Sequence, residues 1–217
     1  VIRTDYEQLI SVFKKNAKGR ENVLRLIPSL FTFEIFSVCA QYDTLVYLDS
    51  DMIIRKDISE LFNMKESIVV TPDAGVYDLN KHVRTFNGGF MVLNGGNDLV
   101  KHKMGLINYA NSMRTMVLAD QTIMNSYFAK HKLTYLDSRY NCLKRCFSDG
   151  NFNKFDDNIK IVHYVGAKPW IPSKLAMEAK YKKIENLWHV LYAESKTTHT
   201  KIGKSFHSSK KAVFIHL

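Results

Sequence analysis

The chain has 217 residues, of which 46% are hydrophobic, and its formal net charge at pH 7 is +10. That length and apolar content are enough for one sizeable buried core and do not require a second domain. No apolar run approaches the ~20 residues of a membrane-spanning helix, and residues 1–5 lack the pattern of a secretory signal. The three cysteines, Cys39, Cys142 and Cys146, are too few for a disulfide framework and include no second pair for a zinc site. We therefore expect a reduced, cytoplasmic protein.

The apolar pattern, taken in chain order, predicts a mixed α/β protein. Residues 7–18 carry apolar side chains at a helical spacing, and residues 25–40 indicate a longer helix that Pro28 interrupts. Short apolar runs alternate with the helical patterns and predict strands. The further predicted strands are 44–48, 67–70, 89–93 and 160–165, and the further predicted helices are 58–62, 98–113, 120–131 and 173–194. This alternation is typical of helices packed on a sheet.

Two carboxylates, Asp49 and Asp51, stand where the apolar strand 44–48 ends. Side chains at positions i and i+2 of a strand point to the same face, so both carboxylates can face one ligand. In open α/β sheets, ligands bind beyond the carboxyl ends of the strands. Paired carboxylate oxygens at that place suit Mg²⁺ or Mn²⁺. Because Asp-x-Asp also occurs in solvated turns, the pair alone does not establish a metal site.

Further segments resemble, in the right order, the motifs of family-8 glycosyltransferases, the group that contains glycogenin and the bacterial lipopolysaccharide galactosyl- and glucosyltransferases. Residues 42–52 and 57–62 resemble the metal-binding segment of that family, and residues 86–94 resemble its Asn-x-Gly strand. The other matching segments are 71–74, 119–125, 140–141 and 161–170. The ordered series is a stronger signal than any single match.

The resemblance implies a GT-A fold, which is a Rossmann-like mixed sheet flanked by helices. It also implies transfer of a hexose from a UDP-sugar to a saccharide acceptor with retention of anomeric configuration. A diphosphate leaves in this reaction, and a divalent metal stabilises its developing charge as a Lewis acid. By resemblance, Asp49, Asp51 and His163 hold Mn²⁺ or Mg²⁺. A histidine at the end of a buried strand is otherwise more often a core residue.

The resemblance also assigns residues to the substrates. Asp120 and Gln121 are the implied catalytic residues, either for a glycosyl-enzyme or for stabilising an oxocarbenium-like state. Of these routes, front-side attack by the acceptor with help from Gln121 is favoured. Asp120 would also serve as the N-cap of helix 120–131. The implied binding residues are Ser50, Asn87, Gly88, Gly166 and Lys168 for the nucleotide-sugar, and Asp73 for the acceptor or the sugar.

Two features depart from the family pattern. The family normally carries a further segment, with the first strand and the uracil pocket, before the region that matches residue 1. The amino-terminal strands of the fold are therefore expected to be missing from a domain at residues 1–195. In addition, the family normally has a Lys or Arg facing the donor where this chain has Thr32 and Phe33. A degenerate, non-catalytic binding or scaffold domain is the alternative to an active enzyme.

Residues 196–217 contain five lysines, three histidines and no acidic residue. This basic segment is expected to form a tail that is either solvated or in contact with anionic lipid headgroups. Nucleic-acid binding is not expected, because no zinc-finger, homeodomain or RNP-type pattern accompanies the charge. We expect an enzyme at the inner face of the cell membrane that serves bacterial cell-surface polysaccharide or lipopolysaccharide synthesis. The sequence leaves the donor sugar open.

Overall fold

The computed structural model describes residues 4–17, 26–73, 85–113, 119–147, 158–171, 181–198 and 211–216. Its strands are β1 (Thr44–Asp49), β2 (Met52–Ile54), β3 (Ile68–Pro72), β4 (Phe86–Asn94), β5 (Thr134–Tyr135), β6 (Cys142–Leu143), β7 (Ile161–His163) and β8 (Lys211–His216). Its α-helices are α1 (Thr4–Ala17), α3 (Ile35–Val38), α4 (Asn97–Ser112), α5 (Ala119–Phe128) and α7 (Lys182–Thr198). Short 3-10 helices are η1 (Ile27–Glu34), η2 (Cys39–Gln41), η3 (Ser59–Asn63), η4 (Ser138–Tyr140) and η5 (Lys144–Phe147).

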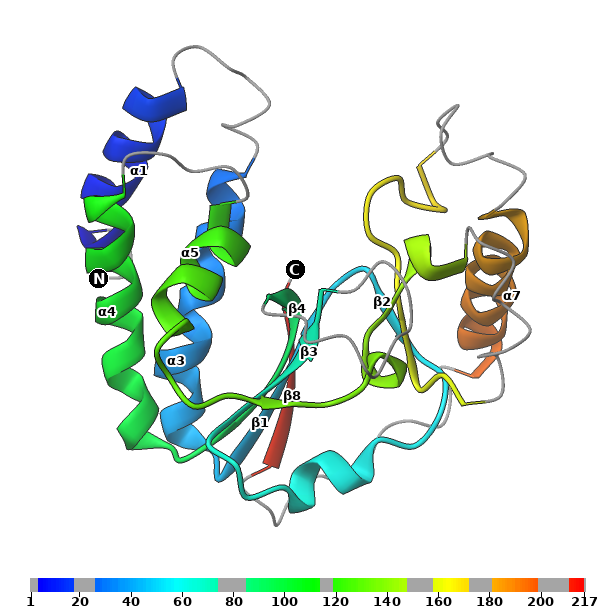
Figure 1. Ribbon diagram of the computed structural model, residues 1–217. Helices are drawn as coiled ribbons and strands as arrows, with labels where there is room; N and C mark the ends of the chain where they lie inside the picture. The colour runs from blue at the N-terminus through cyan, green and yellow to red at the C-terminus, as the bar shows by residue number, and fades with distance from the viewer. Residues whose placement is uncertain are drawn as a thin grey trace.

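The strands form two sheets, a larger one in the order β5-β3-β4-β1-β8 and a smaller one in the order β2-β7-β6 (Figure 1). In the larger sheet, β1 runs antiparallel to β4, with Tyr47 opposite Met91, and parallel to β8, with Leu48 opposite Ile215. The first five residues of β1 are all buried. This burial confirms the prediction of a strand covered on both faces.

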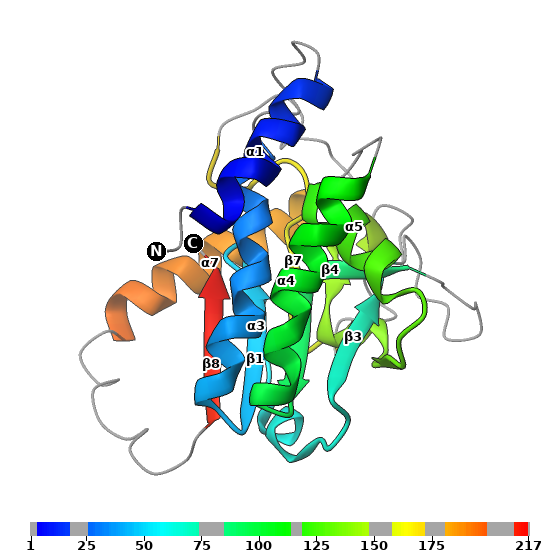
Figure 2. The ribbon, with the colours of Figure 1, turned by 90° about the vertical axis from the view of Figure 1, so that its left-hand side faces the viewer.

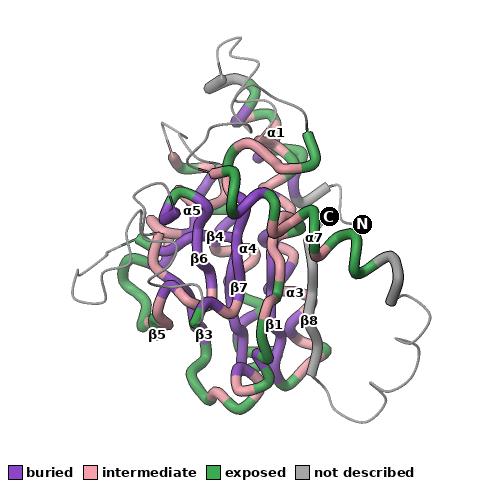
Figure 3. The backbone as a smooth tube through the Cα atoms, turned by 90° about the vertical axis from the view of Figure 1, so that its right-hand side faces the viewer, coloured by how far each residue is buried: buried purple, intermediate pink, exposed green. Residues whose placement is uncertain are grey.

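Two apolar cores lie on opposite faces of the larger sheet, because side chains alternate along a strand. Leu45 and Tyr47 of β1 join one core, whereas Val46 and Leu48 join the other. Helices α1, α3, α4 and α5 cover the first of these faces (Figure 2). Buried residues are concentrated in strands of both sheets, such as β4 and β7, whereas helix α7 is largely exposed (Figure 3).

The smaller sheet brings a distant part of the chain to the end of β1. Strand β2 follows β1 after a tight turn and runs antiparallel to β7, with Met52 opposite His163. The backbone N–H of Tyr164 donates to the carbonyl of Asp51 at 2.9 Å. This pairing places His163 beside the turn that carries the two aspartates.

Helix α7 is attached to the smaller sheet and to the loop that follows β7. The hydroxyl of Tyr164 donates to the carbonyl of Ile184 at 2.9 Å. The buried ammonium of Lys144 lies 2.5 Å from the carboxylate of Glu185 and donates to the carbonyl of Ala167 at 2.8 Å. One lysine therefore joins the helix to the loop, and removing it would leave a buried carboxylate unpaired.

Several elements differ from the sequence expectation. The helix expected at 25–40 is divided into η1, α3 and η2, and Pro28, which has no N–H to donate, lies at the start of η1. The helix expected at 58–62 is the 3-10 helix η3. Of the helix expected at 173–194, residues 172–180 lie outside the described residues, and α7 continues to Thr198.

Strand β8 lies within the basic segment expected to be a tail, and its backbone pairs with β1. No strand is predicted there from the sequence, because the strand with which it pairs, β1, is far away in the chain. The division of the chain at residue 195 stays a prediction. Among the described residues, no helix is long and apolar enough to cross a membrane.

Candidate functional site

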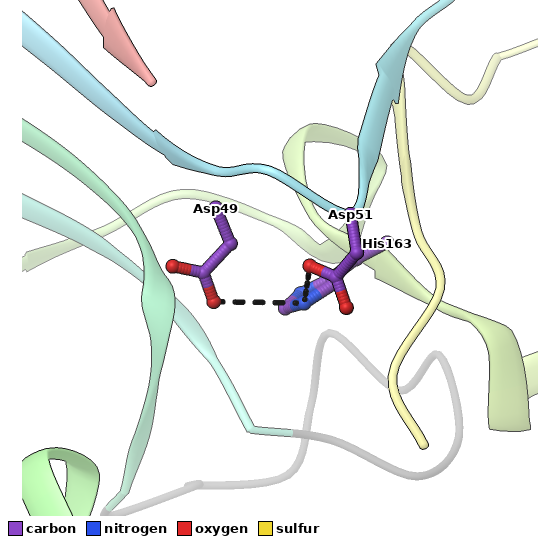
Figure 4. A group of neighbouring side chains, drawn as sticks. All are labelled: Asp49, Asp51 and His163. Carbon is purple, nitrogen blue, oxygen red and sulfur yellow. Dashed lines mark ion pairs between the residues drawn. The ribbon is translucent and has the colours of Figure 1, made fainter. Parts of the chain in front are cut away.

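Three side chains that can bind a metal meet where β1 and β7 end. Asp49 is the last residue of β1, Asp51 lies in the turn before β2, and His163 is the last residue of β7 (Figure 4). The Nε2 atom of His163 lies 3.0 Å from Oδ1 of Asp51 and 3.8 Å from Oδ2 of Asp49. One ligand atom from each residue lies within 4.8 Å of the others.

A buried amide sets the orientation of His163. The side-chain NH₂ of Asn141 donates to Thr71 Oγ1 and to Asn87 Oδ1, both at 2.9 Å. Its oxygen therefore accepts from Nδ1 of His163 at 3.0 Å. With the proton on Nδ1, a neutral imidazole presents a lone pair at Nε2 to the two carboxylates. That lone pair repels their oxygens unless a proton or a metal ion lies between, so the donor set fits a divalent cation.

Asp49 is held by its neighbours on β1 and β4. The hydroxyl of the buried Tyr47, two residues earlier on the same face, donates to Oδ1 of Asp49 at 2.6 Å. Burial, followed by the nearby Asp49 charge, raises the pKa of Tyr47, so the phenol remains a donor. On β4, a Cβ at Gly89 would lie 2.6 Å from both Asp49 Oδ2 and His163 Cε1. Only glycine fits this position without moving a ligand.

Asp51 is paired with Lys168, whose ammonium also donates to the carbonyl of Tyr164 at 3.0 Å. Burial alone would raise the pKa of Asp51, but the hydrogen bonds and charges of His163 and Lys168 hold it below its usual value. Between β7 and Lys168, Gly166 has a φ of 79°, a conformation that side chains other than glycine rarely adopt. The loop thus carries Lys168 back over the aspartates.

Neutral amides form the opposite side of the site. The NH₂ group of Asn87 and the backbone N–H of Gly88 both donate to Oε1 of Gln121 at 3.2 Å. The NH₂ group of Gln121 donates to Asp73 at 3.0 Å, and Asp73 is also paired with Arg145. Both polar atoms of the Gln121 side chain are therefore fixed by hydrogen bonds.

Asp120 lies in the first turn of α5, after Ala119, and is not the N-cap residue of that helix. Burial raises the pKa of Asp120 to about 6, a hydrogen bond with Ser29 opposes the rise, and the charge of Asp49 adds to it. A carboxyl group that ionises this close to neutral pH inside a pocket is typical of a functional residue.

One cavity of about 590 Å³ connects these groups. Its walls include ten of the eleven site residues predicted from the sequence: Asp49, Ser50, Asp51, Asn87, Gly88, Asp120, Gln121, His163, Gly166 and Lys168. Asp73 does not line the cavity and reaches it through Gln121. The lining residues without a predicted role are Ser29, Thr32, Gly89, Val165 and Trp170. For Gly89, a glycine inside a buried strand is the signal that could have identified a close approach.

A family model described as "Glycosyl transferase family 8" matches residues 5–174. The chain belongs to glycosyltransferase family 8. Human Glycogenin-2 is 30% identical over 136 residues, which cover 59% of this chain and 25% of that protein. Lipopolysaccharide 1,2-glucosyltransferase of Escherichia coli is 26% identical over 166 residues, 65% of this chain and 48% of that protein. The chain spans between 21% and 48% of the length of these and other curated relatives.

Solved structures show the same fold at low sequence identity. An active-site mutant of LgtC superposes with a TM-score of 0.54 and 18% identity, covering 76% of this chain and 67% of LgtC. GlyE of Streptococcus pneumoniae superposes with a TM-score of 0.51 and 19% identity, covering 74% of this chain and 46% of GlyE. The fold is therefore of the GT-A type, with mixed sheets flanked by helices. The family and the fold class predicted from the sequence are both confirmed.

Proposed function

We propose that this chain contains the catalytic domain of a metal-dependent, retaining glycosyltransferase that moves a hexose from a UDP-sugar to a saccharide acceptor. The observation that carries the proposal is the meeting of Asp49, Asp51 and His163 with Lys168 and the amide network in one cavity. Charged groups that suit a metal and a diphosphate thus lie beside neutral groups that suit sugar hydroxyls.

Asp49, Asp51 and His163 would hold Mn²⁺ or Mg²⁺, because carboxylate oxygens and imidazole suit both cations. When bound, the metal supplies Lewis-acid stabilisation of the leaving diphosphate. The Lys168 ammonium, now paired with Asp51, lies where it can turn to a phosphate oxygen and add a second positive charge. Gly166 leaves that loop open to the phosphates, since nothing lies within 4 Å of the position of its missing Cβ.

Asp120 and Gln121 would act at the sugar. Gln121 is held by hydrogen bonds to Asn87, Gly88 and Asp73, so its amide has a fixed position relative to the cavity. The Asp120 carboxylate, desolvated in the same cavity, would stabilise positive charge that develops on the sugar ring. We propose front-side attack, in which the acceptor enters on the face from which the diphosphate leaves.

A degenerate binding domain is the second candidate. It is favoured by Thr32, a lining residue that carries a hydroxyl group where the family resemblance predicts a cation. Without that cation the donor would bind less tightly, and the domain would hold a nucleotide-sugar without transferring it.

The deciding experiment compares Asp51→Asn with the exposed control Asp98→Asn. Calorimetry measures Mn²⁺-dependent UDP binding, and a discontinuous assay measures hydrolysis and transfer of UDP-glucose and UDP-galactose. We expect Asp51→Asn to abolish both signals and Asp98→Asn to keep them, because only the first removes a charged ligand. Unchanged Mn²⁺ affinity and activity in Asp51→Asn would contradict the proposal. If the wild type binds UDP but neither hydrolyses nor transfers the UDP-sugars, the degenerate domain is favoured.

The acceptor and the location belong to the same proposal. The relatives include Lipopolysaccharide 1,2-glucosyltransferase of Escherichia coli, and its name supports a bacterial surface polysaccharide as the product. We propose peripheral contact of the lysines in 196–217 with the anionic inner face of the cell membrane. Co-sedimentation with phosphatidylglycerol vesicles tests this contact, using glutamine at Lys196, Lys201 and Lys204, which leaves β8 unchanged. Equal partition of the variant and the wild type would contradict it.

A further inference from the structure

An exposed tryptophan lies at the edge of the cavity, on the loop that carries Lys168. Trp170 lines the cavity, yet 40% of it is exposed to solvent. The next residue, Ile171, is 52% exposed. A large aromatic side chain left partly exposed beside a polar cavity has a face available to a ligand.

The indole ring of Trp170 is supported from behind by helix α7. Its centroid lies 5.1 Å from that of Trp188, and the ring of Trp188 stacks on Tyr192 at 4.8 Å with an angle of 14° between the planes. Trp188 and Tyr192 stand one helical turn apart, so they form a continuous ridge on α7. Tyr192 is itself 48% exposed, and the aromatic surface therefore continues away from the cavity.

The loop and the helix are held together, so this surface is preformed. The backbone N–H of Ile171 donates to the carbonyl of Lys168 at 3.1 Å, which closes a turn around Trp170. Lys144 joins the carbonyl of Ala167 to Glu185 of α7. A ligand that stacks on Trp170 therefore does not have to order the loop first, which reduces the entropic cost of binding.

We propose that Trp170, supported by Trp188 and Tyr192, is a stacking platform for the acceptor saccharide at the mouth of the cavity. This inference rests on the proposed transferase function. Front-side attack requires the acceptor on the side of the leaving diphosphate, and Trp170 follows the phosphate-facing Lys168 by two residues. The apolar C–H face of a pyranose ring stacks on indole, while its hydroxyl groups remain free for hydrogen bonds.

The shape of the surface favours a saccharide over the uracil base. A nucleotide has a fixed length, and its flat base binds most favourably when it is buried in a pocket rather than lying on an exposed surface. An acceptor chain continues into solvent, as the aromatic surface does from Trp170 to Tyr192. Stacking of uracil on Trp170 is the competing outcome of the test.

The chain offers a direct probe, because its two tryptophans are Trp170 and Trp188. The variant Trp188→Phe keeps an aromatic ring behind the platform and leaves Trp170 as the only tryptophan. Its emission is followed during titration with maltose, lactose, cellobiose and xylobiose, with and without Mn²⁺ and UDP. We expect at least one disaccharide to shift the emission of Trp170 in a saturable manner.

Substitution of the platform then measures its contribution. We expect Trp170→Ala to weaken binding of that disaccharide by about tenfold, a loss typical of one aromatic stacking contact, and Trp170→Phe to recover part of it. Ile171→Ala, at an even more exposed neighbour without a ring, is the matched control and should bind as the wild type. Calorimetry with the disaccharide gives the affinity of each variant.

The outcomes separate this inference from the proposed function. If Mn²⁺ and UDP alone shift the emission of Trp170 and no disaccharide does, the ring stacks on the base and the inference is wrong. If no disaccharide changes the emission of Trp170 or binds in calorimetry, the inference is also wrong, whether or not UDP binds. If the wild type binds a disaccharide through Trp170 but shows no Mn²⁺-dependent binding of UDP, only the proposed transferase function is contradicted.

Discussion

The two ends of the cavity are built from different chemistry. At the end proposed to bind the metal, called the metal end, the side chains of Asp49, Asp51, His163 and Lys168 are charged or can bind a cation. Their positions depend on contacts between two sheets. At the end proposed to bind the sugar, called the sugar end, Asn87 and Gln121 are neutral amides that are hydrogen-bonded to each other. Removing one partner of a charged pair in a partly desolvated site costs several kcal/mol, because the other charge is left unpaired. Removing a hydrogen bond between neutral groups costs about 1 kcal/mol. Substitutions at the metal end should therefore have the larger effects. Mn²⁺ affinity and the rate of sugar transfer should be separable by substitutions at the two ends.

Among variants that leave all three proposed metal ligands in place, the largest effect is expected from Gly89→Ala. Its new Cβ would meet Asp49 Oδ2 and His163 Cε1 at 2.6 Å, so two ligands must move. Mn²⁺ affinity, measured by calorimetry, is expected to fall by about a hundredfold or more. The neighbouring Gly88→Ala is the control, because its closest contact is the flexible end of Met124 at 3.0 Å, and it should cost much less affinity. Equal Mn²⁺ affinity in both variants would show that the close packing at Gly89 does not position the metal ligands.

Asn141→Leu tests a side chain that joins both ends. It removes the acceptor of His163 Nδ1 and the donor to Thr71 Oγ1, both buried, while Asn87 Oδ1 keeps the N–H of Gly89. We expect Mn²⁺ affinity to fall about tenfold to a hundredfold and the free energy of unfolding to fall by about 2 kcal/mol. Asn108→Leu, at an exposed position of α4, should change neither quantity. Wild-type Mn²⁺ affinity in a folded Asn141→Leu protein would rule out its role in orienting His163.

Gln121→Met tests whether sugar transfer can be lost while Mn²⁺ binding is kept. The substitution keeps the length of the side chain but removes the amide that joins Asn87 and Gly88 to Asp73. Transfer from UDP-glucose or UDP-galactose is expected to slow by about a hundredfold, the usual cost of one polar group that acts on the transition state. Mn²⁺ affinity should change less than twofold, since no metal ligand is touched. Parallel loss of both would mean that the two ends act as one unit.

The smallest effect is expected in the helical layer, away from the cavity. Burial is the main cause that lowers the pKa of His102 to about 4, with the charges of His131 and Lys101 adding to it. The unfolded chain binds this proton below pH 6.5 and the folded chain does not, so stability falls as the pH drops from about 6.5 towards 4. We expect about 1–2 kcal/mol less stability at pH 5 than at pH 7 from this group.

Urea unfolding at several pH values measures that slope. His102→Phe should flatten it, because the titrating group is gone, whereas His189→Gln at an exposed position of α7 should leave it as in the wild type. A slope that persists unchanged in His102→Phe would assign the pH dependence to other groups.

The sequence by itself determined the features that depend on local pattern. The apolar run before Asp49 predicts a buried strand, and the structure shows one. Alternation along that strand places Tyr47 and Asp49 on one face. The motifs in order also identified the family and the fold class, which the comparisons confirm. Ten of the eleven predicted site residues line one cavity, although their roles stay proposals.

Only the tertiary structure decided how segments distant in the chain meet. The register of β2 on β7 brings His163 to Asp51, and the fold places Asn141 behind the imidazole and Gly89 against both ligands. The pairing of β8 with β1 and the packing of Trp170 on Trp188 are equally non-local. Local propensity does not encode such contacts, because each depends on the sum of many packing and hydrogen-bonding interactions elsewhere in the chain. Asn141 and Gly89, which would position the proposed metal ligands without binding the metal themselves, are therefore residues to which the sequence motifs assign no role.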